Sequence, residues 1–103
     1  MPTIDHSRFY RHDELLALLR ALAAEQPGFV AVDTIGRSFE GREIVVVTVT
    51  DTTTGPAADK PAFWVDGNIH SVELSASTAC LYFVDWLLKN REHNGDVARA
   101  LAT

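Results

Sequence analysis

The fold is organised around residues 63–73, which read FWVDGNIHSVE. An apolar run ends at Asp66 and Gly67, and small and apolar residues resume after Glu73. The run before the glycine is typical of a buried strand, and the stretch after the glutamate is typical of a helix. We therefore expect His70 at the C-terminal end of a strand, with Glu73 in the first turn of the next helix. In open α/β sheets, ligands bind in that crevice.

His70 and Glu73 have the chemistry and spacing of two ligands to one metal ion. Residues three apart share a helix face, zinc takes imidazole nitrogen and carboxylate oxygen, and a catalytic zinc site keeps one position open for water. On spacing alone a plainer interpretation is more common, in which the histidine caps the helix and the glutamate favours its N-terminus electrostatically. The turn at 66–68 favours zinc, because a sharp turn between a packed strand and a helix fixes both side chains.

Three landmarks along the chain resemble one enzyme family. Residues 65–73 resemble the first zinc motif of the metallocarboxypeptidases of the carboxypeptidase A type, peptidase family M14. Residues 35–44 resemble the strand-turn-strand that opens the catalytic domain of that family, and residues 10–19 resemble its leading helix. The resemblance covers nearly the whole chain, with the landmarks in the right order. It implies the α/β class, as the N-terminal part of a mixed β-sheet with helices on both faces.

The resemblance also implies a function. Residues 1–103 would be the N-terminal portion of one zinc metallocarboxypeptidase domain, which acts on peptide or protein C-termini and hydrolyses the C-terminal peptide bond. Zn²⁺ is the implied cofactor, with His70 and Glu73 as ligands and with Asp66 and Asn68 as groups that support the ligands or face the substrate. The family's second histidine ligand, general base, carboxylate-binding arginine and neighbouring tyrosine come from later sequence. We therefore expect no catalytic residue here, and a truncated, inactive fragment.

The motif departs from the family at one position, and other functions stay open. Many members carry an arginine directly before the motif glutamate, where Val72 stands in this chain. A divergent, bacterial-type branch fits this difference better than the digestive enzymes do. One alternative is a zinc-dependent deacylase of the aspartoacylase or succinylglutamate desuccinylase type, which shares the His-x-x-Glu core. The other is a non-catalytic α/β module that binds a partner chain through its open sheet edge and uncovered helix.

Composition limits the partners and the compartment. A chain of 103 residues allows one domain, and 47% hydrophobic residues are enough for a core. The net charge of −5 argues against nucleic acid and against an anionic membrane as partner. No apolar run could span a bilayer and no signal peptide is visible, so a cytoplasmic location is the default expectation. Cys80 is the only cysteine, and we expect an inert buried thiol.

Periodicity predicts the remaining elements. Leucines recur at helical spacing before Pro27, and Gly41 is expected at positive φ in the turn of an antiparallel hairpin. Of the other polar residues, Asp96 is expected to cap the last helix, and His6, His12 and His93 are expected in solvent. The pattern predicts a helix from about Asp13 to Pro27, strands at Phe29–Ile35, Arg42–Thr50 and Ala62–Asp66, a loop at Asp51–Pro61, and helices at about Ser71–Lys89 and Val97–Ala102.

The strand at Arg42–Thr50 contains a continuous run of valines and is expected to be buried on both faces. In the topology that the family resemblance implies, a later strand inserts between this strand and the strand at Ala62–Asp66. We therefore expect these two strands about two strand spacings apart, roughly 10 Å, with no ladder between them. The helix at Ser71–Lys89 is apolar on most sides and would be incompletely covered. Exposed edges of this kind predict an isolated chain that is unstable, that aggregates, or that closes the gap by direct pairing of these two strands.

Overall fold

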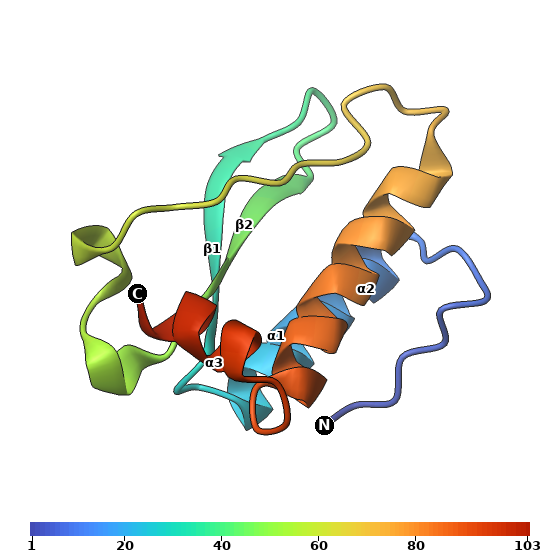
Figure 1. The fold of residues 1–103 in the computed structure, drawn as a ribbon. Helices are drawn as coiled ribbons and strands as arrows, with labels where there is room; N and C mark the ends of the chain where they lie inside the picture. The colour runs from blue at the N-terminus through green and yellow to red at the C-terminus, as the bar shows by residue number, and fades with distance from the viewer.

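The computed structural model describes all 103 residues and contains three α-helices and one β-hairpin (Figure 1). The α/β class is confirmed, and the expected helices and hairpin strands are present with boundaries shifted by up to three residues. The chain order is α1 (His12–Glu25), β1 (Val30–Arg37), β2 (Glu43–Val49), the short 3-10 turns η1 (Thr52–Thr54) and η2 (Ala57–Asp59), α2 (Leu74–Asn90) and α3 (Gly95–Ala102).

Helix α1 buries one leucine stripe. Leu16, Leu19 and Leu22 are buried, and Leu22 has no exposed surface. At the start of the helix the Glu14 carboxylate accepts a hydrogen bond from the Arg11 backbone N–H at 2.8 Å, which satisfies one of the donors left free at a helix N-terminus. Complete burial of each leucine side chain contributes roughly 1.5–3 kcal/mol of hydrophobic stabilisation. The stripe therefore fixes α1 against the hairpin.

The hairpin is antiparallel and is covered on one face only. Its register runs from Val30 opposite Val49 to Arg37 opposite Glu43, and Gly41 has the expected positive φ of 80° in the turn. The expectation that β2 is buried on both faces is wrong, because every β2 residue is half-buried or exposed. Alternate β2 side chains pack towards the core, while no helix covers the opposite face. The valine run therefore marks a strand with one free apolar face.

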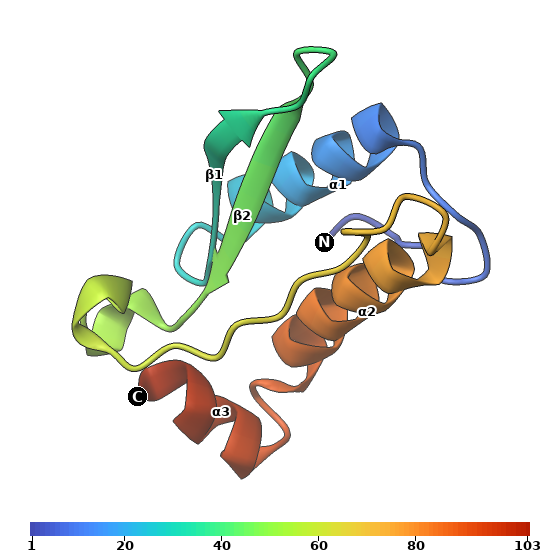
Figure 2. The same ribbon diagram turned by 90° about the horizontal axis from the view of Figure 1, so that it is seen from above.

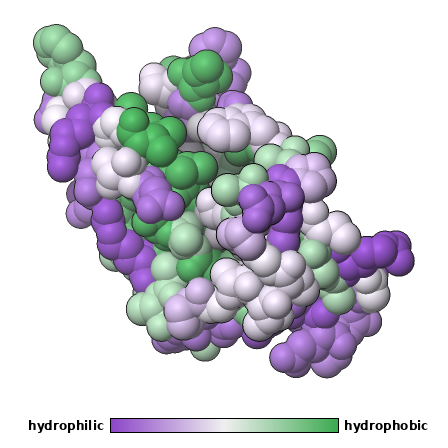
Figure 3. All heavy atoms as spheres, turned by 90° about the vertical axis from the view of Figure 1, so that its left-hand side faces the viewer, coloured by the Kyte–Doolittle hydropathy of each residue, from purple (hydrophilic) through white to green (hydrophobic).

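The core lies where the N-terminal segment, α1, β1 and α2 meet. Figures 1 and 2 place α1 and α2 on the same side of the hairpin. Only 11 of the 103 residues are buried, so much apolar surface remains exposed, as Figure 3 shows for one face. On α2 the exposed side chains include Tyr82, Phe83 and Trp86, in agreement with the expected incomplete covering of this helix. The core cluster consists of Ile4, Leu19, Leu22, Val30, Leu81 and Leu88.

The predicted strand at Ala62–Asp66 is wrong. The sheet has two strands only, and no backbone–backbone hydrogen bond involves residues 61–69. Figure 2 shows this segment passing apart from the hairpin. Its side chains are exposed, with 86% of Phe63 and 68% of Trp64 accessible to solvent. A strand needs a neighbouring strand to satisfy its backbone groups, and no strand lies beside this segment.

The N-terminal segment corrects a second expectation, because His6 is not in solvent. Its Nε2 lies 2.8 Å from Oδ2 of Asp85 on α2, and its ring meets the Tyr82 ring edge-on at 5.0 Å. Ile4 enters the core and is only 7% exposed, which carries the nearby histidine against α2. His12 and His93 are exposed, as expected. The sequence shows no periodicity around His6, so this contact could not be predicted from spacing.

The sequence analysis expected Asp96 to cap α3, but the capping residue is Asn94. The Asn94 side-chain oxygen accepts hydrogen bonds from the backbone N–H groups of Asp96 at 3.0 Å and Val97 at 3.4 Å. Asn94 has an extended backbone, which is the conformation of a capping residue, whereas Asp96 already lies inside the helix and pairs with Arg99. The expectation therefore placed the cap two residues too late.

One backbone carbonyl joins α3 to the end of the hairpin. The Leu101 carbonyl accepts hydrogen bonds from the Asp51 backbone N–H at 2.9 Å, the Thr50 hydroxyl at 3.1 Å and the Lys60 ammonium at 3.2 Å. The partial negative charge at a helix C-terminus favours such donors. None of the three helices is long and apolar enough to cross a membrane.

Candidate metal site

The loop at 66–73 is shaped by two residues at the turn before the histidine. Asn68 has a positive φ of 68°, which asparagine tolerates better than most residues. Gly67 lies so close to α2 that a Cβ at this position would come within 2.9 Å of the Ala76 backbone. Glycine is therefore required by close approach and not by its own φ. The two residues turn the chain sharply just before His70.

His70 and Glu73 lie side by side, as the spacing predicts. The distance between His70 Nδ1 and Glu73 Oε2 is 3.5 Å, and the Glu73 backbone N–H donates to the His70 carbonyl at 3.0 Å. This hydrogen bond closes a turn that ends before α2 begins at Leu74. Glu73 therefore lies one residue before the helix, whereas the sequence analysis expected it in the first helical turn. The side chains are 74% and 57% exposed, which leaves both accessible from solvent.

The pair supplies two donors of the type that zinc takes, an imidazole nitrogen and a carboxylate oxygen. Both are accessible, and they are close enough to face one ion between them. No group of three or more histidine, cysteine, aspartate or glutamate side chains in residues 1–103 is placed to hold a metal ion. The donors therefore fit two positions of a zinc site, and this chain does not bring a third protein ligand to them.

Asp66 and Asn68 brace the loop from within. The Asp66 carboxylate accepts a hydrogen bond from the Trp64 indole N–H at 2.8 Å. The Asn68 amide donates to the Ser71 carbonyl at 3.3 Å, and its oxygen accepts from the Ser77 hydroxyl on α2 at 3.1 Å. Asn68 therefore links the turn to α2 and holds the section that carries His70. A role of either residue towards substrate stays a prediction.

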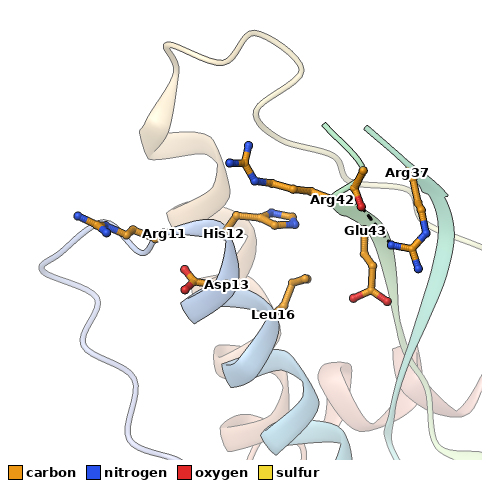
Figure 4. Close-up of a pocket in the computed structure, with 8 residues that line it drawn as sticks. Arg11, His12, Asp13, Leu16, Arg37, Arg42 and Glu43 are labelled. Atoms are coloured by element: carbon orange, nitrogen blue, oxygen red, sulfur yellow. Dashed lines mark hydrogen bonds between the residues drawn. The ribbon is translucent and has the colours of Figure 1, made fainter. Parts of the chain in front are cut away.

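One hollow in the surface is lined by neither residue of this pair. It has a volume of about 770 Å³ and separates the start of α1 from the end of the hairpin (Figure 4). The Arg42 side chain extends from the hairpin turn towards His12 of α1 (Figure 4). Packing brings these distant segments together, which local sequence patterns do not reveal. Its lining residues are Arg11, His12, Asp13, Leu16, Arg37, Gly41, Arg42 and Glu43.

A second hollow, of about 540 Å³, touches the motif loop. It lies where the N-terminal segment meets the first turns of α1 and α2, with Phe9 and Tyr10 on one side and Asn68 and Leu74 on the other. Neither His70 nor Glu73 lines either hollow. The metal ligands predicted from the sequence therefore sit on an open surface beside this hollow.

Cys80 on α2 is half-buried, where full burial was expected. Burial raises the pKa of its thiol, and the negative charge of Asp66 raises it further. A thiol with a raised pKa carries less thiolate, which is both the nucleophile and the metal ligand form. Cys80 is therefore a poor third ligand and a poor nucleophile.

Comparison with known proteins decides the family. The family model described as zinc carboxypeptidase, Peptidase M14, matches residues 15–102. The chain belongs to the zinc carboxypeptidase family. Among its zinc carboxypeptidase relatives, carboxypeptidase B of Astacus astacus is 30% identical over 94 residues, which are 91% of this chain and 30% of that protein. Carboxypeptidase A1 of Bos taurus is 35% identical over 81 residues, which are 79% of this chain and 18% of that protein.

The match confirms the resemblance drawn from the three landmarks and places the chain in a family of hydrolases, the zinc metalloproteases. Zinc carboxypeptidase A 1 of Drosophila melanogaster adds a third relative, 31% identical over 91 residues, with 85% of this chain and 21% of that protein covered. The chain thus spans between 18% and 30% of the length of these relatives. The activity of a whole zinc carboxypeptidase is therefore a proposal for this chain.

Proposed function

We propose that residues 1–103 form the N-terminal portion of the catalytic domain of a zinc metallocarboxypeptidase, which hydrolyses the C-terminal bond of a peptide or protein substrate. Family membership over residues 15–102 supports the reaction class. The observation that carries the proposal is the His70–Glu73 pair, with the Nδ1 and Oε2 atoms 3.5 Å apart at the position of the family's first zinc motif. In this proposal the two residues are zinc ligands.

The residues around the pair have supporting roles in this proposal. Zinc bound there would polarise the scissile carbonyl and lower the pKa of a bound water. His70 and Glu73 supply two of its donors from an accessible surface. Gly67 and Asn68 set the turn that aims His70, and the Asn68–Ser77 hydrogen bond at 3.1 Å fastens that turn to α2. Such supporting contacts are typically worth 10–100-fold in metal affinity or activity.

The surface of the chain supports the proposal that it is part of a larger domain. Its accessible surface is 6945 Å², whereas a compact protein of 11.3 kDa exposes about 5,700 Å². The excess includes the aromatic side chains of Phe63 and Trp64 and the free face of β2. In a mixed sheet, a further strand between β2 and residues 62–66 would pair the free backbone edges of both, and helices on its faces would cover these side chains. Until they are covered, the isolated chain is prone to aggregation.

Zinc binding tests the ligand assignment. With two protein ligands and solvent in the other positions, the chain should bind zinc weakly, because each missing ligand and its supporting contacts lowers affinity. Titration against a zinc-sensitive chelator should give weak binding that is lost in His70→Ala. His12→Ala is the matched control, since His12 is also exposed but lies on α1, and it should bind as the unaltered chain does. Tight binding that survives His70→Ala would refute the assignment.

Catalysis tests the proposal that residues 1–103 are an incomplete enzyme. This segment alone should release no C-terminal residue above background, because loss of a general base and of substrate-binding groups lowers hydrolase rates by several orders of magnitude. Extension of the chain with the missing half of a carboxypeptidase domain should restore release, and His70→Ala in that longer protein should abolish it. Zinc-dependent release by the isolated segment is the result that contradicts incompleteness.

A further inference from the structure

The half-buried Lys60 ammonium lies among four oxygen atoms, which we call the oxygen cage. Its Nζ donates hydrogen bonds to Thr54 Oγ1 at 2.7 Å and to Thr50 Oγ1 at 2.8 Å. It also donates to the Asp51 carbonyl at 2.9 Å and to the Leu101 carbonyl of α3 at 3.2 Å. A lysine ammonium has three N–H donors, so the cage offers one acceptor more than a lysine can pair with separately.

Both hydroxyl groups of the cage turn their lone pairs towards Nζ. Thr50 Oγ1 donates its proton to the Leu101 carbonyl at 3.1 Å. Thr54 Oγ1 donates its proton to the Asp51 carbonyl at 2.8 Å. A hydroxyl has one proton and two lone pairs, so each has only acceptor sites left to face the ammonium. All four oxygens therefore direct partial negative charge at one point, as the carbonyl oxygens of potassium channels do around a monovalent cation.

The cage keeps its shape through contacts that do not involve Lys60. The Thr52 backbone N–H and hydroxyl donate to the Gly28 carbonyl at 3.0 Å and 2.9 Å, which fastens the turn η1 to the start of the hairpin. The Asp51 carboxylate accepts from the Thr53 backbone N–H at 3.0 Å and from its hydroxyl at 2.6 Å. This carboxylate is therefore engaged within η1, and the cage itself consists of neutral oxygens that stay in place without the ammonium.

We propose that the oxygen cage is a binding site for a small monovalent cation, and that the chain fills this site with its own Lys60 ammonium. The cation fastens α3 to the end of β2, because the Leu101 carbonyl and the Thr50 hydroxyl both bind it. It also anchors the chain directly before residues 61–69, which make no backbone–backbone hydrogen bonds. When the lysine side chain is shortened, a free ammonium ion with its four N–H groups should occupy the cage.

Amide hydrogen exchange of Lys60→Ala, in the full chain that carries these residues, tests the proposal. The reporter is the Asp51 amide, which donates to the Leu101 carbonyl at 2.9 Å. Its exchange should be roughly tenfold faster, since hydrogen bonds to a charged group contribute at least that factor. Ammonium chloride should restore slow exchange, whereas tetramethylammonium chloride, with the same charge but no N–H, should not. Rates are corrected for intrinsic exchange in each salt, and the Leu22 amide reports on global unfolding.

Two further lysine variants separate cation binding from packing and from net charge. Lys60→Met keeps an unbranched apolar side chain in place of the lysine stem, so Asp51 exchange should be faster and ammonium should not restore it. Lys89→Ala removes the only other lysine, which is 57% exposed on α2. Asp51 exchange in this variant should match that of the unaltered chain, with no response to ammonium.

A pair of variants at Thr54 tests the cage while Lys60 stays in place. Thr54→Val removes one oxygen at nearly constant shape, so Asp51 exchange should be severalfold faster, whereas Thr54→Ser keeps the oxygen and should leave the rate unchanged. If Lys60→Ala exposes the Leu22 amide by unfolding the chain, this pair decides alone. Unchanged exchange in Lys60→Ala, failure of ammonium to restore it, equal restoration by tetramethylammonium, restoration in Lys60→Met, or equal rates in Thr54→Val and Thr54→Ser overturns the proposal.

Discussion

Two stretches of this chain contain apolar runs of similar character and have opposite fates. In residues 12–50, Leu22 is fully buried and Val30 is 4% exposed, and both strands find each other across a short turn. In residues 61–73, Phe63 is 86% exposed and no backbone group pairs with another strand. The first stretch carries its own partner within a few residues. The second depends on a partner that is distant in sequence, and apolar content alone does not provide one.

The largest effect expected from this comparison is on stability. Leu22→Ala should lower the free energy of unfolding by about 3 kcal/mol, because it deletes a fully buried side chain from the core. Phe63→Ala removes a larger side chain, yet it should change stability by less than about 0.5 kcal/mol, because that ring is already in water. Urea unfolding curves of both variants check this. Equal losses would mean that Phe63 packs in solution.

A smaller effect is expected at the turn that aims His70. Gly67→Ala places a Cβ within 2.9 Å of the Ala76 backbone, which α2 holds rigidly. The loop must shift, at a cost of about 1–3 kcal/mol, and zinc binding should weaken with it. Gly36→Ala is the matched control, since nothing lies within 4 Å of its Cβ. It should stay within about 0.5 kcal/mol of the unaltered chain. If both variants unfold alike, close approach is not the reason for glycine at 67.

The smallest expected effect is a reaction rate. Burial, aided by Asp66, raises the pKa of the Cys80 thiol, so less thiolate is present at mildly alkaline pH than in a free cysteine. Its reaction with a disulfide reagent should be severalfold slower than that of free cysteine, and denaturant should remove the difference. If Cys80 in the folded chain reacts as fast as free cysteine, its thiol is exposed to solvent, as the Phe63 side chain is.

The sequence predicted correctly those features that depend on contacts between residues close in the chain. The leucine stripe gives α1, and Gly41 gives the hairpin turn, since each depends on neighbours within one or two turns of chain. The His70–Glu73 proximity was predictable for the same reason. The contact of His6 with Asp85 joins residues 79 apart, and no local signal predicts it. The prediction of a strand at Ala62–Asp66 was wrong because an apolar pattern shows only that the residues favour the extended conformation. A strand also needs a second strand beside it for backbone hydrogen bonds. Asn94 was missed because Asp96 is an equally good capping residue and only the backbone angles separate them.

The Leu101 carbonyl has a consequence for how this protein tolerates change. Three donors from the end of β2 and the following loop converge on one backbone oxygen, and every amino acid carries that oxygen. A mutational scan at position 101 would thus report only on the side chain, which is 6% exposed, and would miss the attachment entirely. The attachment becomes visible from the other side: Asp51→Pro removes a backbone donor, and Lys60→Met removes the ammonium. The attachment of α3 to the hairpin therefore depends on a main-chain oxygen, and substitutions at residue 101 cannot reveal it.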